Sequence, residues 1–358
     1  MANNNLAIAK KAKNDEFYTQ YSDIEKEITA YIEYNPDVFK GKTILLPCDD
    51  PEWSNFTKFF AQNFKRFGLK KLISTSFAAE SKNFKTKYQP TLFEKEDPKF
   101  DKSKTTKNGK IFTLTHDKTG DGKVNVEDLE WSYLNGDGDF KSDEIKKLRD
   151  EADIIVTNPP FSIFRDFLAW VVEFKKLFVI IGNKNIVTYK EVFPLIKENK
   201  MWSGRTGWSG GLWFETKNPD DVDKIVNGVN MKNVSSAWFT NIDHGRRHEH
   251  IPLMTMADNL KYSKHKEIKG KDSYDNYDNY DAIEVPYTDA IPSDYCGVMG
   301  VPITFLDKYS PEQFEIIGAT ESEGKGFSNG LWDETSKVAQ PLIRKERVFK
   351  RIFIKHKK

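Results

Sequence analysis

The chain has 358 residues, 38% of them hydrophobic and 13% aromatic, which is enough for one large or two ordinary domains with a substantial core. It contains no apolar run of about 18 residues, and its start is polar, which argues against a membrane-spanning helix and a signal peptide. The net charge of +1 does not by itself indicate a nucleic-acid binder. The two cysteines, Cys48 and Cys296, argue against a disulfide framework, so we expect a cytoplasmic protein.

The first predicted elements follow the order of a doubly wound α/β sheet. Residues 1–14 are polar and predict a flexible arm, and apolar residues at helical spacing predict a helix over 22–34. Strands are predicted at 43–46 and 72–77, and Ser54 is predicted to cap a helix between them. A strand, a helix and a second strand in this order open a mostly parallel sheet with helices on its faces.

The alternation breaks over residues 80–130, which are rich in Lys, Thr, Asp and Gly and predict an insertion or a small β-hairpin region. It resumes with strand-like apolar runs at 153–157, 178–182 and 238–241. Residues 203–235 are rich in Gly, Trp, Asn and Asp, and we predict loops there.

Three later segments carry weaker patterns. Residues 189–199 predict a helix that Pro194 would kink. Residues 272–281 read DSYDNYDNYD, a tyrosine-rich near-repeat that allows either an ordered loop or a low-complexity hinge. Residues 297–317 predict a final βα unit, with a strand at 302–306 and a helix start at 311–317.

The motif Asn158-Pro159-Pro160-Phe161 follows the predicted strand at 153–157 and is the most informative feature of the chain. An exocyclic amine of a nucleobase is a poor nucleophile, and the Asn158 side-chain carbonyl and the Pro159 carbonyl can accept hydrogen bonds from its two N–H groups. Prolines have no backbone N–H, so they present carbonyl groups. A strand-ending turn is the alternative interpretation.

This chemistry needs orientation and electrostatics more than a general base. A base inside a duplex is out of reach, so it must be flipped out and stacked on an aromatic ring, a role that Phe161 fits. The motif therefore predicts methyl transfer to an exocyclic amine.

Polar residues at the carboxyl ends of successive predicted strands indicate a cofactor site. The first such loop has no Gly-x-Gly-x-x-Gly and the chain has no phosphate-binding loop, so a cationic, phosphate-free cofactor such as S-adenosylmethionine is favoured. Asp139 would accept a hydrogen bond from the cofactor's adenine amine, and Phe140 would stack beside that ring. Each acid taken singly could instead be a turn or cap residue. The candidate cofactor residues from these loops are Cys48, Asp49, Asp50, Ser54, Asn55, Ser76, Asp139 and Phe140.

Basic residues in two segments are candidate DNA contacts. Arg246 and Arg247 lie in the sequence HGRRHEH, where phosphate contact, a solvated loop and a metal site are the alternatives, and we expect no metal site. The tail 344–358 carries eight Lys or Arg and one Glu, and it predicts a basic edge strand. Lys350 and Arg351 of this strand are placed on DNA phosphates.

Two further patterns are weighed as structural features. Residues 117–128 imitate a calcium loop, but position 12 is Asp128 and not the usual Glu, so we predict a turn-rich insertion. The tryptophans between 202 and 213 could be core or could support a flipped base, and we favour the core for Trp202 and leave Trp208 open.

The order of these motifs resembles that of the DNA amino-methyltransferases, and most closely the EcoRI-type adenine-specific modification methylases. The stretches that carry the resemblance are DEFYTQ at 15–20, CDDP at 48–51, SNF at 54–56, GDGDF at 136–140, VTNPPFS at 156–162, TYKEVF at 188–193 and GVMGVPITFL at 297–306.

The resemblance implies a Rossmann-like methyltransferase with a doubly wound, mostly parallel sheet and with inserted and C-terminal DNA-recognition segments. Residues 15–245 would form the catalytic domain and 246–358 a C-terminal segment for DNA recognition and fold completion. Phe17, Tyr18 and Thr19 would hold the methionine end of S-adenosylmethionine.

The same resemblance implies transfer of methyl to adenine N6 in double-stranded DNA, with a GAATTC-like target and a cognate restriction endonuclease that makes no direct contact. A monomer is expected, because each site needs one transfer at a time. Methylation of cytosine N4 or of another amine, and an inactive DNA-binding relative, are the alternatives.

Overall fold

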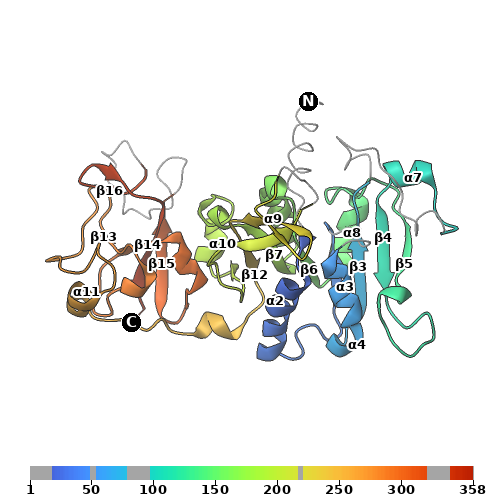
Figure 1. The fold of residues 1–358 in the computed structure, drawn as a ribbon, viewed down its shortest axis with the longest axis horizontal. Helices are drawn as coiled ribbons and strands as arrows, with labels where there is room; N and C mark the ends of the chain where they lie inside the picture. The colour runs from blue at the N-terminus through green and yellow to red at the C-terminus, as the bar shows by residue number, and fades with distance from the viewer. Residues whose placement is uncertain (1–17, 49–53, 79–96, 217–220, 321–338, 358) are drawn as a thin grey trace. The chain divides into compact units, whose positions relative to one another are not determined.

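The computed structural model describes residues 18–48, 54–78, 97–216, 221–320 and 339–357. The chain divides into two compact units (Figure 1). The first comprises residues 1–183 and 209–242, and the second 184–208 and 243–358. The sequence predicts a boundary after residue 245; in the structure it falls after 242, and residues 184–208 join the C-terminal part. The predicted arm, 1–14, lies outside the described residues.

The first unit contains a large α/β sheet. Its strands are β2 (Thr43–Leu46), β3 (Lys71–Thr75), β4 (Lys110–Leu114), β5 (Glu130–Tyr133), β6 (Ile154–Thr157), β7 (Leu177–Asn183) and β12 (Ser236–Thr240), and they lie in the order β5-β4-β3-β2-β6-β7-β12. The central strands β3, β2, β6 and β7 are parallel, whereas β4, β5 and β12 pair antiparallel at the sides. The near-continuous apolar runs of the central strands fit a sheet covered on both faces, so the predicted α/β class with a parallel sheet core is confirmed.

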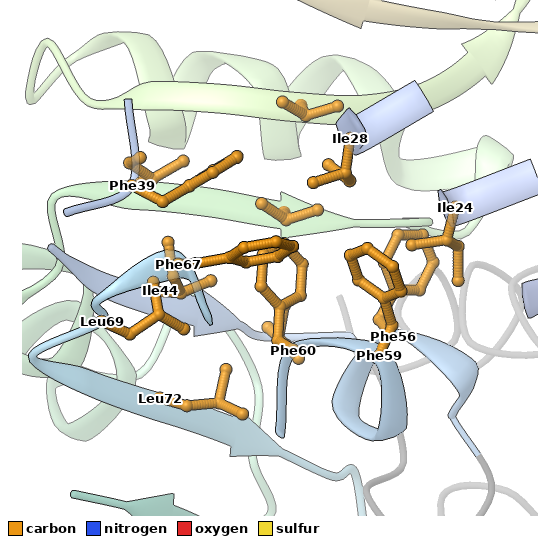
Figure 2. Packing of buried hydrophobic residues seen from close by; sticks show 14 of the residues in the cluster. Ile24, Ile28, Phe39, Ile44, Phe56, Phe59, Phe60, Phe67, Leu69 and Leu72 are labelled. Carbon is orange, nitrogen blue, oxygen red and sulfur yellow. The ribbon is translucent and has the colours of Figure 1, made fainter. Parts of the chain in front are cut away.

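Aromatic residues of one helix form much of the core of this unit. Ser54 accepts a hydrogen bond from the Phe56 backbone N–H at 3.1 Å, which caps the helix as predicted. Figure 2 shows Phe56, Phe59 and Phe60 of this helix on the side of Ile24 and Ile28. Burial of each such ring contributes about 1.5–3 kcal/mol. The helical segments of the unit are α2 (Tyr21–Tyr34), α3 (Asn55–Gln62), α4 (Phe64–Phe67), α7 (Lys102–Lys107), η1 (Val126–Asp128), α8 (Asp143–Glu151), η2 (Phe161–Ile163) and α9 (Phe164–Val172).

Two predictions on insertions have different outcomes. The region 80–130 does contain a β-hairpin, since β4 and β5 pair and extend the main sheet; residues 79–96 lie outside the described part. The prediction of loops over 203–235 is wrong. A second sheet of order β1-β9-β11-β10 forms there from β1 (Tyr18–Thr19), β9 (Leu212–Glu215), β10 (Lys224–Val226) and β11 (Val229–Val234). Gly and Asn serve its turns, as at Asn227 and Gly228 with φ of 50° and 81°.

The second unit is built on a smaller sheet. Its elements are η3 (Lys184–Thr188), α10 (Phe193–Lys197), β8 (Trp202–Ser203), η4 (Gly245–His248), α11 (Met256–Tyr262), β13 (Ile283–Glu284), η5 (Thr288–Ala290), β14 (Met299–Pro302), η6 (Ile303–Asp307), β15 (Phe314–Ala319), β16 (Leu342–Ile343), β17 (Glu346–Arg347) and β18 (Arg351–His356). The sheet has the order β13-β14-β18-β15. The basic tail is therefore not an edge strand: β18 is paired on both sides, which corrects the prediction.

Three other predictions for this unit meet the structure. The helix expected at 189–199 is shorter, and Pro194 lies in its first turn, where no helix hydrogen bond is lost and no kink results. The expected strand at 302–306 and helix start at 311–317 are both wrong, because residues 303–307 form η6, just after β14, and β15 is a strand. The repeat at 272–281 is an ordered loop whose three tyrosines are buried. Across both units, no helix of the described residues is long and apolar enough to cross a membrane.

The calcium-like segment is organised by backbone hydrogen bonds. The Asp117 carboxylate accepts from the N–H groups of Gly120 and Gly122, both at 2.7 Å. The Asp128 carboxylate accepts from Lys118, Thr119 and Asn125, each at 2.9 Å. Both acids thus close turns in an insertion, as predicted. Within the described residues, no group of three or more metal-ligating side chains lies together.

These bonds make one stability prediction. The backbone N–H groups of Thr119 and Asn125 hold the pKa of Asp128 at about 2, below its ordinary 3.8. A lowered pKa stabilises the fold fully above about pH 4 and loses this effect as the pH falls towards 2. We expect Asp128→Asn to lower the Tm at pH 7, and the difference from the parent to shrink below about pH 4.

Thermal unfolding between about pH 7 and 3 measures this difference. Asp121→Asn is the matched control, because Asp121 is exposed and accepts a single bond, from Lys123 N at 2.8 Å. A Tm difference for Asp128→Asn that is the same at every pH contradicts the assignment.

Candidate active site

The carboxyl ends of the parallel strands bring the candidate site residues to one edge of the main sheet. Leu45 of β2 lies opposite Ile155 of β6, so the chain leaves both strands at the same edge, at Pro47 and at Asn158. Thr75, at the end of β3, donates from Oγ1 to the Pro47 carbonyl at 3.2 Å. Because β3 lies on one side of β2 and β6 on the other, the chain reverses its winding direction between β2 and β6. Ligands of open α/β sheets bind at such a switch point.

The motif at the end of β6 forms a tight turn into α9. Asn158, Pro160 and Phe161 are half-buried and Pro159 is buried. The Pro160 carbonyl accepts from Ile163 N at 3.1 Å, which fixes the turn. No backbone N–H of the described residues donates to the Pro159 carbonyl. The turn expected from Asn-Pro is therefore present, and it holds the Pro159 carbonyl in a fixed backbone without using it as a turn acceptor.

The start of α3 is tied to the N-terminal strand β1. Asn55, the first residue of α3, donates from Nδ2 to the Thr19 carbonyl at 2.8 Å. Tyr18 and Thr19 pair with β9, and the Thr19 hydroxyl is buried without a hydrogen-bond partner among the described residues. Cys48, two residues after β2, is half-buried, whereas Phe17, Asp49 and Asp50 lie outside the described residues.

A glycine-rich loop covers the end of β3. Ala78 N donates to the Asp137 carbonyl at 2.8 Å, and Ser76 exchanges hydrogen bonds with the backbone of Lys110, one of them through its hydroxyl. Gly138 has φ of +86°, and a Cβ there would lie 2.3 Å from the Ser76 carbonyl oxygen. Only glycine permits this approach, which places Asp139 at the same edge as Pro47.

Phe140 lies in the core of the first unit. Its ring is 6% exposed and packs edge-to-face against Phe167 and Trp170 of α9, at 5.5 and 5.6 Å. Arg149, itself buried, lies 5.0 Å from the Trp170 ring. Phe140 therefore anchors the glycine-rich loop in the core.

The described residues fit S-adenosylmethionine. The adenine of the cofactor needs an acceptor, and the Asp139 carboxylate lies half-buried at the strand ends. Its amino-acid end needs small polar groups, and the Thr19 hydroxyl is buried without a hydrogen-bond partner among the described residues. Ser54 and Ser76 use their hydroxyls to accept backbone N–H groups, so their role is to shape the loops.

The glycine-rich loop gives a testable result. We expect Gly138→Ala to lower both the Tm and the affinity for S-adenosylmethionine, because the backbone must move away from Ser76. Strain at positive φ costs about 1–3 kcal/mol by itself. Gly120→Ala is the control, since Gly120 has φ of +75° with nothing within 4 Å. Calorimetric titration and thermal unfolding measure both effects, and equal losses in the two variants would argue against the close approach.

Arg246 and Arg247, the predicted DNA contacts, make contacts within the second unit. Arg246 pairs with Asp307 at 3.0 Å. Arg247 is buried over the Trp202 ring at 3.7 Å and bonds Asn199. Burial lowers the pKa of Arg247, and the nearby Asp243 partly offsets this effect. Both guanidinium groups therefore stabilise the fold of this unit, and Trp202 belongs to its packing.

Lys350 and Arg351 also make contacts within the second unit. Lys350 donates to Thr188 Oγ1 at 2.8 Å. Arg351 is 8% exposed and pairs with Glu284 at 2.6 Å, while Phe349 and Lys350 carbonyls accept from its Nη1. Arg351 has almost no exposed surface for a phosphate, so its assignment to DNA is corrected to a structural one. Sequence analysis missed Glu284, because no sequence pattern links two residues 67 positions apart.

Two of the three histidines of HGRRHEH, His244 and His248, are held by hydrogen bonds. His244 Nε2 lies 2.9 Å from the Ser203 carbonyl, and Ser203 Oγ accepts from Trp208, which is therefore core. His248 lies between Asp243 and Glu312, at 2.9 Å from each. Burial opposes its charge, but the hydrogen bonds to Glu312 and Asp243 outweigh burial and raise the pKa of His248 above 6.5.

Comparison with known proteins identifies this arrangement. Residues 5–357 match the family described as "Adenine-specific methyltransferase EcoRI". The chain belongs to this family. It is 42% identical to the Type II methyltransferase M.EcoRI of Escherichia coli over 86% of its own length and 87% of that protein. No solved structure gives a significant match.

Two mycoplasma proteins are also similar to this member of the EcoRI methyltransferase family. Identity is 33% to the Type II methyltransferase M.MpnI of Mycoplasma pneumoniae and 34% to M.MgeORF184P of Mycoplasma genitalium. Each match covers 86% of this chain, and 83% and 84% of the two relatives. The chain is therefore an enzyme, an adenine-specific DNA methyltransferase, which confirms the prediction from its motifs.

Proposed function

We propose that this methyltransferase moves a methyl group from S-adenosylmethionine to N6 of an adenine flipped out of duplex DNA, on a Rossmann-like sheet. The observation that supports this proposal best is the position of the Asn158 turn. It follows β6 directly at the switch point between β2 and β6, next to the loop that begins at Pro47.

The turn would activate the amine by accepting its hydrogen bonds. The Asn158 side-chain carbonyl and the Pro159 carbonyl each accept one N–H of the target amine, which orients the nitrogen lone pair for attack. The prolines fix the backbone, so these acceptors are aligned before the base arrives, and preorganised groups of this kind lower barriers most. The Phe161 ring stacks on the flipped base.

S-adenosylmethionine supplies an electrophilic methyl group when it is bound. We assign its methionine end to Phe17, Tyr18 and Thr19 with the loop after β2, in which Cys48, Asp49 and Asp50 replace the usual glycine-rich turn. Asp139 holds its adenine amine. Asn55 orients Thr19 through the hydrogen bond to its carbonyl.

The substrate is double-stranded DNA with a GAATTC-like target. The relatives are named Type II methyltransferases, which supports a protective methylase acting beside a restriction endonuclease without touching it. We place the enzyme in the cytoplasm as a monomer. We assign residues 15–245 to catalysis and 246–358 to DNA recognition. Residues 184–208, although within the catalytic range, belong to the same compact unit as the recognition segment.

A methyl-transfer assay on unmethylated duplex DNA with nucleoside mass spectrometry tests this function. N6-methyladenine is the expected product. N4-methylcytosine would overturn the adenine assignment, because the same turn can accept that amine. Absence of product from a protein that binds S-adenosylmethionine would indicate an inactive relative. Loss of methylation from a duplex with GAATTC changed to GAGTTC would support the target.

A further inference from the structure

We infer that the hairpin of β16 and β17, residues 342–347, is a preformed contact element for the phosphate backbone of duplex DNA. The inference rests on the proposed function, since that function makes DNA the substrate. In Figure 1 β16 is seen at the upper end of the second unit. Leu342 pairs with Arg347 and Ile343 with Glu346, so Arg344 and Lys345 form the two-residue tip.

The tip exposes a concentration of positive charge. The hairpin 342–347 carries three cations and one carboxylate. The Arg344 side chain is 82% exposed, and Lys345 and Arg347 are also exposed. Phe349, which follows, is 60% exposed. Exposed cations beside an exposed ring are typical of surfaces that bind nucleic acids.

The backbone of the tip is strained. Arg344 and Lys345 have φ of 52° and 69°, in the left-handed region that side chains other than Gly and Asn disfavour. Asn-Gly is the preferred pair for such a turn, and the chain uses that pair, Asn227 and Gly228, in its own β10–β11 hairpin. Arg344 and Lys345 thus occupy the two turn positions that Asn227 and Gly228 fill, with less strain, in the β10–β11 hairpin.

The tyrosine-rich repeat holds the strained tip in place. Asp278 accepts from Lys345 N at 2.7 Å and from Arg344 N at 3.3 Å. Asn279 accepts from Leu342 N at 2.8 Å and donates to the Gln340 carbonyl at 3.0 Å. The polar residues of the repeat therefore fix the hairpin backbone.

The tyrosines of the repeat anchor this clamp in the core. The rings of Tyr277 and Tyr280 are buried against Phe353 of β18, with ring centroids 6.1 and 4.7 Å apart. The clamp explains why DSYDNYDNYD is ordered. A hairpin that is fixed in advance loses little entropy when it binds.

The partner that fits is a polyanion with exposed charge. Arg344 already pairs with Asp275 at 3.0 Å, but an ion pair this exposed contributes about 0–1 kcal/mol and exchanges readily for a phosphate. The guanidinium of Arg344 can then bind two phosphate oxygens. Among polyanions, duplex DNA is the one that the proposed reaction requires.

The double variant Arg344→Asn with Lys345→Gly tests the inference without endangering the fold. It installs the turn pair of the β10–β11 hairpin, so we expect an unchanged or higher Tm. If both cations contact phosphates, the slope of log K against log salt falls by about 2, and affinity at about 0.15 M salt falls roughly 10- to 30-fold. Fluorescence anisotropy of a labelled duplex containing GAATTC measures both.

Two other variants test whether the position of the cations and the rigidity of the hairpin matter, apart from positive charge alone. Lys266→Gln with Lys269→Gln removes two exposed lysines elsewhere in the same unit and should weaken binding less. Asp278→Ala keeps the cations and removes the clamp, so affinity should fall while the salt slope stays near the parent value. A parental affinity and salt slope in the tip variant would overturn the inference, as would equal losses in the lysine control.

Binding and methyl transfer are read separately. Tip-dependent DNA binding without any methylated product keeps this inference and refutes the proposed function. Methylation by an enzyme whose DNA binding does not depend on the tip keeps the proposed function and refutes this inference. Binding that depends on the tip but prefers an RNA hairpin or an acidic protein over the duplex also overturns the assignment to DNA.

Discussion

Asn158→Ala is expected to lower the rate of methyl transfer by about 10²–10³-fold or more, as removal of one preorganised polar group does in other active sites. The side chain lies at the end of β6, where it would accept a hydrogen bond from the target amine. An interaction made with the reacting nitrogen affects kcat, whereas the residues that we propose for the cofactor lie on β1, in the loop after β2 and at Asp139. The affinity for S-adenosylmethionine should therefore stay within about threefold of the parent value.

Single-turnover methyl transfer and calorimetric titration of the cofactor measure these two quantities. Ser162→Ala is the matched control, since Ser162 is exposed and lies in the same turn. Asn158→Asp retains side-chain acceptors and should keep more activity than the alanine variant. Loss of cofactor binding in Asn158→Ala, at an unchanged Tm, would move Asn158 from the target amine to the cofactor.

The first unit was predictable where hydrophobic pattern and position agree. The runs at 43–46 and 153–157 are apolar throughout most of their length, which a parallel strand buried on both faces requires. The loops that follow such strands must meet at one edge, so the order of the strands alone is enough to place Pro47 and Asn158 together. The cap at Ser54 was predictable because it depends on local sequence alone.

The errors arose where the decisive partner is remote in the chain. The tail alternates cations with Val348, Ile352 and Ile354, which is typical of an edge strand, but the place of β18 between β14 and β15 depends on residues 32 or more positions away. Phe140 follows an acid, as an adenine-stacking ring would, yet α9 provides the aromatic surface that buries it. In 203–235 the glycines and asparagines of the turns dominate the composition, so the short strands β9, β10 and β11 between them gave no clear sequence pattern.

Removing the charge of Arg351 is expected to destabilise the second unit strongly. The guanidinium makes hydrogen bonds of 2.6–3.2 Å to both oxygens of the Glu284 carboxylate, and both side chains are almost fully buried. Tyr277 donates to the same carboxylate. Loss of one partner leaves an uncompensated buried charge, which costs about 3–5 kcal/mol, so Arg351→Met should lower the free energy of unfolding by that amount.

The matched variants decide between a structural role and DNA contact. Lys355→Met, on the same strand but half-buried, should change the stability by only about 0.5 kcal/mol. Combining Arg351→Met with Glu284→Met removes both charges and should restore much of the loss, because apolar pairs of similar volume replace buried ion pairs at little cost. Urea unfolding followed by circular dichroism measures these differences. If Arg351→Met instead kept its stability and lost DNA affinity, the guanidinium would have to reach a phosphate, and the pair with Glu284 would not govern the fold of β18. Recovery in the double variant is the result that only a buried, mutually neutralising pair explains.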